Sequence, residues 1–186
     1  FGQFYRHGHR EQDAIDVYQR GLTLVPDRVA LAVGIADSFA ALRDAVQATA
    51  WYAKARAMDQ GDPAAVLAEA EYDRTRLEYD AAVQVLKSAI SVMPGEASIR
   101  QALGDVYMEQ HAYANAEAAY LAAANLDQRD ASYEISLGRL YHELGRGQAA
   151  LVAFTRALAI APAGTRAYNE LAREYAHQGN TVQASS

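Results

Sequence analysis

The sequence predicts an all-α fold built from consecutive antiparallel helix-turn-helix units. The chain has 186 residues, of which 51% are apolar, with only 4 prolines and 12 glycines, and such a composition favours helices over a many-turned β fold. The sequence also repeats itself at an offset of 34 residues. Each repeated block holds two segments of helix length and no period-2 alternation, so no strand is expected.

The repeat is clearest where the block 131–164 aligns with the block 97–130 without a gap. Leu137 and Gly138 fall on Leu103 and Gly104, and further matches at the same offset are Tyr107 with Tyr141, Ala116 with Ala150, Tyr120 with Phe154 and Ala123 with Ala157. Extending the offset in both directions predicts a single array over residues 1–186. Its parts are a partial repeat 1–28, full repeats 29–62, 63–96, 97–130 and 131–164, and a partial repeat 165–186.

The repeated residue types have a physical reason. Small residues at the eighth place of each block let the two helices of a hairpin approach closely; they are Ala36, Ala70, Gly104, Gly138 and Ala172. Aromatic residues then fill the remaining space between helices. Pro26, Pro94 and Pro162 stand where a second helix is expected to end, because proline cannot continue the hydrogen-bond ladder.

These residues resemble the tetratricopeptide repeat, and the best single instance is Leu137, Gly138, Tyr141, Ala150, Phe154, Ala157 and Pro162. The resemblance covers the whole chain. It implies a right-handed α-solenoid whose first helices line a concave groove for a peptide or a partner protein, while the second helices form the convex back. It therefore implies a protein-interaction scaffold without catalytic activity.

The resemblance also indicates which residues face the groove. One place after the small residue, successive blocks carry Gln3, Asp37, Glu71, Asp105, Arg139 and Arg173, a series that changes sign along the chain. Further residues expected in the groove are Met108, Glu109, Ile135, His142, Glu143, Asn169 and His177. An alternative interpretation is that the charged members are ordinary solvated surface. The branch of the family that grips a chaperone's C-terminal carboxylate is disfavoured, because its places hold small or acidic residues here, such as Val33 and Asp37.

Glu69 and Asp73 are unusual, because other blocks carry Leu and Tyr at these two places. Three interpretations stay open. The favoured one is that the helix rotates, so that Val66, Leu67, Ala70 and Leu77 pack and the acids reach solvent. The second is a packed ion cluster with Arg74, Arg76 or Arg100. The third is a pair of catalytic carboxylates, which would need a substrate cleft that nothing else in the sequence builds.

The histidines indicate no metal site by themselves. His7 and His9 have no third ligand near them in sequence. His142 and His177 are expected to lie near each other at the turn ends of adjacent first helices, but two ligands do not make a structural zinc site. No phosphate-binding loop and no nucleophile with a base is visible. We therefore expect no metal, no cofactor and no catalytic residue.

Composition limits the partners. The net charge of −6 comes without a basic tract, which argues against nucleic acid, and no apolar run is long enough to span a membrane. The absence of cysteine is compatible with a reducing or an oxidising compartment, so the location stays open between cytoplasm and periplasm.

The alternative function is a periplasmic scaffold in a bacterial export or exopolysaccharide secretion system that guides an acidic or basic polymer. We also expect the chain to be a fragment of a larger protein. Weak self-association is expected through repeat ends, where Phe1, Phe4, Tyr5, Tyr168 and Tyr175 lack partners.

Overall fold

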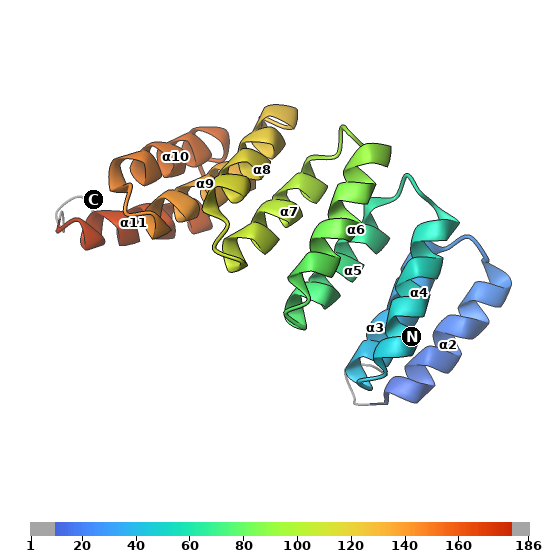
Figure 1. Cartoon of the computed structure of the whole chain (residues 1–186). Helices are drawn as coiled ribbons and strands as arrows, with labels where there is room; N and C mark the ends of the chain where they lie inside the picture. The colour runs from blue at the N-terminus through green and yellow to red at the C-terminus, as the bar shows by residue number, and fades with distance from the viewer. Residues whose placement is uncertain (1–9, 180–186) are drawn as a thin grey trace. The chain divides into compact units, whose positions relative to one another are not determined.

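The structure is a computed structural model that describes residues 10–179. This part of the chain contains helices and no strand, as Figure 1 shows, so the predicted all-α fold is confirmed. The helices are α2 (Glu11–Leu24), α3 (Val29–Ala41), α4 (Ala45–Met58), α5 (Pro63–Thr75), α6 (Tyr79–Val92), α7 (Ala97–Glu109), α8 (Tyr113–Leu126), α9 (Ala131–Glu143), α10 (Gly147–Ile160) and α11 (Thr165–His177).

The helices form antiparallel hairpins, in an all-α solenoid arrangement, and divide into two compact units. Unit 1 is residues 1–94 and includes α2 to α6, and unit 2 is residues 95–186 and includes α7 to α11. The first helix of each hairpin begins at the residue that opens a 34-residue block: Val29, Pro63, Ala97, Ala131 and Thr165. Each proline that was expected to end a second helix lies two residues beyond it, as Pro162 does after α10.

The turn inside each hairpin requires one residue in the left-handed region of backbone space. This residue is Gly145 between α9 and α10, with φ of 66°. The same place holds Arg43, Leu77 and His111 in the other hairpins, with φ between 56° and 63°. Non-glycine residues there cost about 1 kcal/mol each, so the tight turn is imposed by the packing of the two helices rather than by local preference.

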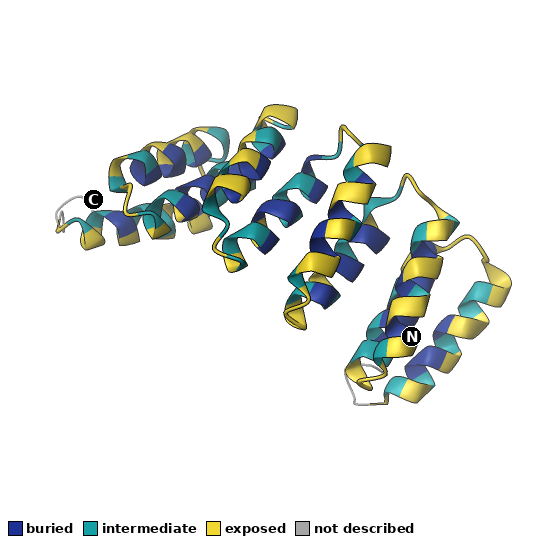
Figure 2. Cartoon of the chain, in the orientation of Figure 1, coloured by how far each residue is buried: buried dark blue, intermediate teal, exposed yellow. Residues whose placement is uncertain are grey.

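Inside each hairpin the small residue of the first helix lies against a large residue of the second. A Cβ placed on Gly138 would overlap the ring of Phe154, and a Cβ on Gly104 would overlap the ring of Tyr120. Phe154 is 1% exposed and Tyr120 is 2% exposed. Figure 2 shows the resulting pattern, in which buried residues follow the helix faces turned toward neighbouring helices and exposed residues follow the opposite faces.

No helix in residues 10–179 has the length and apolar character needed to cross a membrane.

Candidate partner-binding face

The first helices of unit 2 lie side by side and are joined by polar side chains. Gln101 of α7 donates a hydrogen bond to Ser136 of α9 over 3.1 Å. His142 of α9 lies 2.5 Å from Glu174 of α11, measured from Nδ1 to Oε2. We refer to the surface formed by these three helices as the α7–α9–α11 face. It is the part of unit 2 that corresponds to the groove expected from the sequence.

The predicted groove residues differ in their accessibility. In unit 1, Glu71 is exposed and Asp37 is half-buried. In unit 2 the exposed ones are Asp105, Glu109, Arg139, Glu143, Asn169, Arg173 and His177, while Met108 and His142 are half-buried. Ile135 is 6% exposed and packs in the core with Phe154 and Ala167, so its side chain supports the fold and presents no surface to a partner. Gln3 lies outside the described residues.

Two acids of the series have a role inside their own hairpin. Asp105 accepts a hydrogen bond of 2.7 Å from the hydroxyl of Tyr120, and Asp37 accepts one of 2.7 Å from the hydroxyl of Tyr52. Each tyrosine is 2% exposed, so its hydroxyl needs a protein partner. Burial is the main reason that the pKa of Tyr120 is raised, and the charge of Asp105 beside it raises that pKa further.

The hairpins that contain Glu71 and Arg139 lack this hydrogen bond, because their second helices have no tyrosine at the corresponding place. The residue fifteen places after Glu71 is Leu86, and the residue fifteen places after Arg139 is Phe154. Neither has a hydroxyl that needs an acceptor. The hydrogen bonds from Tyr52 and Tyr120 therefore explain Asp37 and Asp105 by folding without a partner, whereas Glu71 and Arg139 have no such bond to a tyrosine fifteen residues later.

Arg139 and Arg173 have no such task in the hairpin. Their side chains are 56% and 68% exposed, and they lie on adjacent helices of the face. Glu170 lies between them, 2.8 Å from Arg173 and 4.0 Å from Arg139. The Glu170 side chain is only 15% exposed, whereas both guanidinium groups that pair with it keep most of their surface in solvent.

The favoured interpretation of Glu69 and Asp73 was wrong, because both side chains are buried, at 4% and 6% exposed. The helix does not rotate to expose them. Glu69 pairs with Arg56, whose Nε lies 2.5 Å from Oε2 and whose Nη2 donates to Oε1 over 3.4 Å. A packed ion pair is thus present, but its cation comes from α4 and is none of the three arginines expected.

The four residues expected to pack in place of these acids differ in burial, and Leu67 is half-buried. Val66 and Ala70 are buried as expected, while Leu77 is 70% exposed at the hairpin turn.

Burial is the main reason that the pKa of Glu69 is raised, with Arg56 opposing the shift and Asp73 adding to it. Burial also raises the pKa of Asp73, and Glu78 adds to that shift while Arg76 opposes it.

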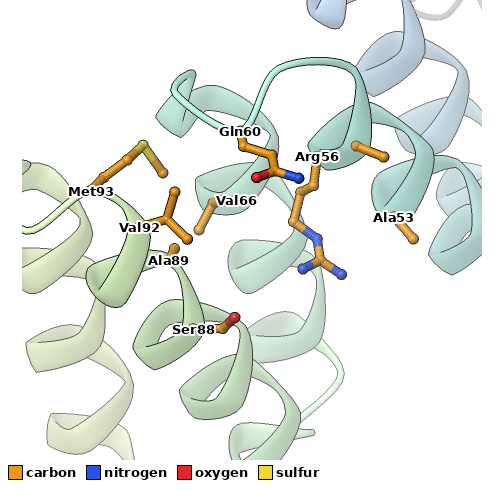
Figure 3. Close-up of a pocket in the computed structure, with 9 residues that line it drawn as sticks. Ala53, Arg56, Gln60, Val66, Ser88, Ala89, Val92 and Met93 are labelled. Carbon is orange, nitrogen blue, oxygen red and sulfur yellow. The ribbon is translucent and has the colours of Figure 1, made fainter.

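Pockets in each unit lie mainly against the second helices. In unit 1 a pocket of about 310 Å³ lies among α4, α5 and α6. Figure 3 shows Arg56 and Gln60 on one side of this pocket and Val92 and Met93 on the other, with Val66 between them. In unit 2 a pocket of about 370 Å³ is lined by residues of α8, α9 and α10, among them Leu121 and Tyr141. None of the predicted groove residues lines either of these two pockets.

One pocket involves the predicted face. It has a volume of about 350 Å³ and lies at the end of α9 and α11, lined by His142, Gly145, Gly147, Gln148, Glu174, His177 and Gln178. His142 and His177 lie with ring centroids 5.0 Å apart, so the expected approach of these two residues is seen. Glu174, which sequence reasoning missed, is 2% exposed and offers a carboxylate oxygen within 4.8 Å of a ring nitrogen of each histidine.

Comparison with known proteins supports the repeat family. Two family descriptions of the tetratricopeptide repeat match residues 78–140 and 135–163. Residues 78–163 therefore carry tetratricopeptide repeats, as the sequence pattern predicted. No curated protein sequence matches the chain significantly.

Solved structures show the same fold. A thermophilic tetratricopeptide-repeat protein of Thermus thermophilus is 23% identical with a TM-score of 0.70, covering 94% of this chain and 94% of that one. YrrB, described as a tetratricopeptide-repeat protein with an unusual peptide-binding site, is 17% identical with a TM-score of 0.58, covering 90% and 86%.

A chain of the APC/C hetero-tetramer Cut9-Hcn1 is 20% identical with a TM-score of 0.67 over 98% of this chain. This chain spans only 37% of that one. At these identities the likeness shows the fold alone.

Proposed function

We propose that the chain is a non-catalytic scaffold that binds an acidic segment of a partner protein on its α7–α9–α11 face. The observation that carries this proposal is the pair Arg139 and Arg173, two exposed guanidinium groups on adjacent first helices. Arginine binds carboxylates through two parallel hydrogen bonds and is therefore well suited to a polar docking surface.

The spacing of the two arginines defines the kind of segment. Both guanidinium groups reach the one carboxylate of Glu170, over 2.8 Å and 4.0 Å, so they lie no more than about 9 Å apart, less than the roughly 10 Å between the axes of packed helices. A polyproline-type segment rises about 3.1 Å per residue with three residues per turn, and so presents every third side chain on one side about 9 Å apart. An extended segment with acidic residues at positions i and i+3 therefore fits the pair.

Charge elsewhere on the face gives the segment a direction. Asp105 and Glu109 are exposed on α7, at the other side of the face from α11. A partner with its acids toward α11 and a basic residue toward α7 would meet opposite charge at each end. Electrostatic complementarity of this kind fixes orientation and speeds association more than it raises affinity.

The likeness to YrrB, whose described feature is a peptide-binding site, supports a peptide ligand for this fold. The alternative of a scaffold in a secretion system, with a polymer as its ligand, stays a prediction from composition.

The experiment is a selection of peptides from a random display library on the purified chain, followed by titration of the best peptides by fluorescence anisotropy. Enriched peptides should carry acids three residues apart. The double variant R139E/R173E should bind them at least tenfold more weakly, with the loss largest at low salt because exposed charges are screened within about 8 Å at physiological ionic strength.

A matched control is R129E/R166E, which changes the net charge equally. Arg129 and Arg166 are exposed near the starts of α9 and α11, about two helical turns or more from the proposed docking pair. The control should bind as the parent does. Equal weakening in both variants would show that net charge alone attracts the peptide, and a selection without enriched peptides would contradict the proposal.

A further inference from the structure

The ends of α9 and α11 bring together three side chains with metal-ligating atoms. His142, Glu174 and His177 each offer one such atom, and these atoms all lie within 4.8 Å of one another. Glu174 and His177 are three residues apart on α11, so they share one face of that helix. His142 reaches them from the last turn of α9.

The carboxylate at the centre of this cluster is held in place. Oε1 of Glu174 accepts a hydrogen bond of 2.7 Å from Gln178, which leaves Oε2 directed at His142. A Cβ on Gly147 would lie 2.7 Å from Oε1 of Glu174, so the glycine at the start of α10 makes room for the acid. Such an arrangement, with the second oxygen fixed by a neighbour, is how proteins orient metal-ligating carboxylates.

The local electrostatics favour a cation. The cluster lies at the C-terminal ends of two helices, where the backbone dipoles present partial negative charge. Three arginines are near the cluster in sequence, and each has a counter-charge. Arg139, three residues before His142, and Arg173, directly before Glu174, pair with Glu170. Arg146, directly before Gly147, pairs with Glu117 over 3.6 Å. A buried carboxylate, two imidazoles and two helix ends thus surround one point beside a pocket of about 350 Å³.

We propose that His142, Glu174 and His177 bind one divalent transition-metal ion, best suited to Zn²⁺. Two imidazoles and one carboxylate are ligands that zinc accepts in tetrahedral geometry, with a fourth position open to water. Ligand atoms around zinc lie about 3.3 Å apart when each bond is about 2.0 to 2.1 Å. His142 is half-buried and His177 is exposed, so both rings have space in which to turn toward one shared point.

Binding would connect α9 to α11 and so fasten the last described helix onto the hairpin before it. This consequence does not depend on the scaffold function proposed above. Fastening of α11 can be measured as a change in stability, which tests the site independently of metal affinity.

The experiment is a titration of the full chain with ZnCl₂ by calorimetry in a non-chelating buffer. The histidines at positions 7 and 9 lie outside the described residues and could bind metal by themselves, so the parent for this experiment carries H7N and H9N. We expect one equivalent of Zn²⁺ to bind, a higher Tm, and slower amide exchange in α11. Co²⁺ in its place should give the strong visible absorption of a tetrahedral site.

Single variants test the three ligands. H142N, H177N and E174Q should each weaken Zn²⁺ binding by at least about tenfold, whereas H111N, which changes an exposed histidine outside the cluster, should leave it unchanged. Because Glu174 is buried, circular dichroism of E174Q checks its fold, and H177N at an exposed position provides an independent test. Absence of saturable binding, or equal loss in H111N, would overturn the site and leave the His142–Glu174 contact as a structural hydrogen bond.

Discussion

The hydrogen bond from Tyr120 to Asp105 allows the contribution of Asp105 to the free energy of unfolding to be measured. Y120F removes a hydroxyl that donates to a carboxylate over 2.7 Å. A hydrogen bond to a charged group contributes about 1.5 to 3 kcal/mol, and because Asp105 is exposed and regains water when the hydroxyl is removed, we expect a loss near 1 to 1.5 kcal/mol. D105A leaves a buried hydroxyl without its acceptor, which costs about 1 to 3 kcal/mol.

The double variant D105A/Y120F removes both partners, so its loss should be clearly smaller than the sum of the two single losses. We expect a coupling energy of about 1 to 2 kcal/mol, within the range found for residues in contact. The measurement is equilibrium urea unfolding followed by circular dichroism, in which the midpoint shifts and the slope stays constant.

A control cycle pairs Y120F with E143A, since Glu143 is exposed on the next first helix. These two changes should add within about 0.3 to 0.5 kcal/mol. If D105A and Y120F were equally additive, the hydroxyl would not stabilise the hairpin through Asp105, and the account of the acidic series as a folding feature would be refuted.

Three further predictions concern packing and buried charge. G138A should lower the free energy of unfolding, because the overlap with Phe154 costs about 1 to 3 kcal/mol against a gain in helix propensity of about 1 kcal/mol, and F154L should remove this penalty in calorimetry. D73N should stabilise the chain by about 1 kcal/mol at pH 7, since burial of an acid is unfavourable when it is ionised. The folded pKa of Asp73 is raised, so the parent loses stability as pH rises through it, and the advantage of D73N should vanish toward pH 4 in urea titrations at several pH values. R56M should destabilise the chain by about 2 to 3 kcal/mol because it leaves Glu69 buried without its cation, and E69Q in the same background should recover part of the loss in thermal melts.

The helical hairpins were predictable because the repeat has a constant length, so the helix boundaries of one block give those of the others. One well-marked block, from Ala131 to Gly164, sets the start of every other first helix through the offset of 34 residues. The small residue at the eighth place predicts the close approach seen at Gly138. The intrinsic backbone preferences of Leu77 and His111 do not predict their left-handed conformation, which only the packing of the hairpin explains.

The accessibility of single side chains was less predictable, because it depends on neighbours in other helices. The burial of Glu69 required knowledge that Arg56 reaches it from α4. The sequence did contain a signal for the roles of Asp37 and Asp105, since a tyrosine follows each of them by fifteen residues, whereas Leu86 and Phe154 follow Glu71 and Arg139.

Glu174 carried a signal of a similar kind. It occupies the place where the preceding block has the buried Leu140, and an acid at an apolar place is the feature that singled out Glu69. Its position beside His142 and His177 could be inferred from the repeat offset. The hydrogen bond from Gln178 and the space left by Gly147 are properties of the folded ends of the helices and needed the structure.

The most direct test of the central claim is a map of the peptide-binding surface by backbone amide chemical shifts in NMR. A peptide selected on the chain is titrated into labelled protein, and the shifts are assigned along α7 to α11. The account predicts that the largest changes fall on the α7–α9–α11 face around Arg139 and Arg173 and are lost in R139E/R173E. Changes centred instead on α8 and α10, around the pocket lined by Leu121 and Tyr141, would contradict it.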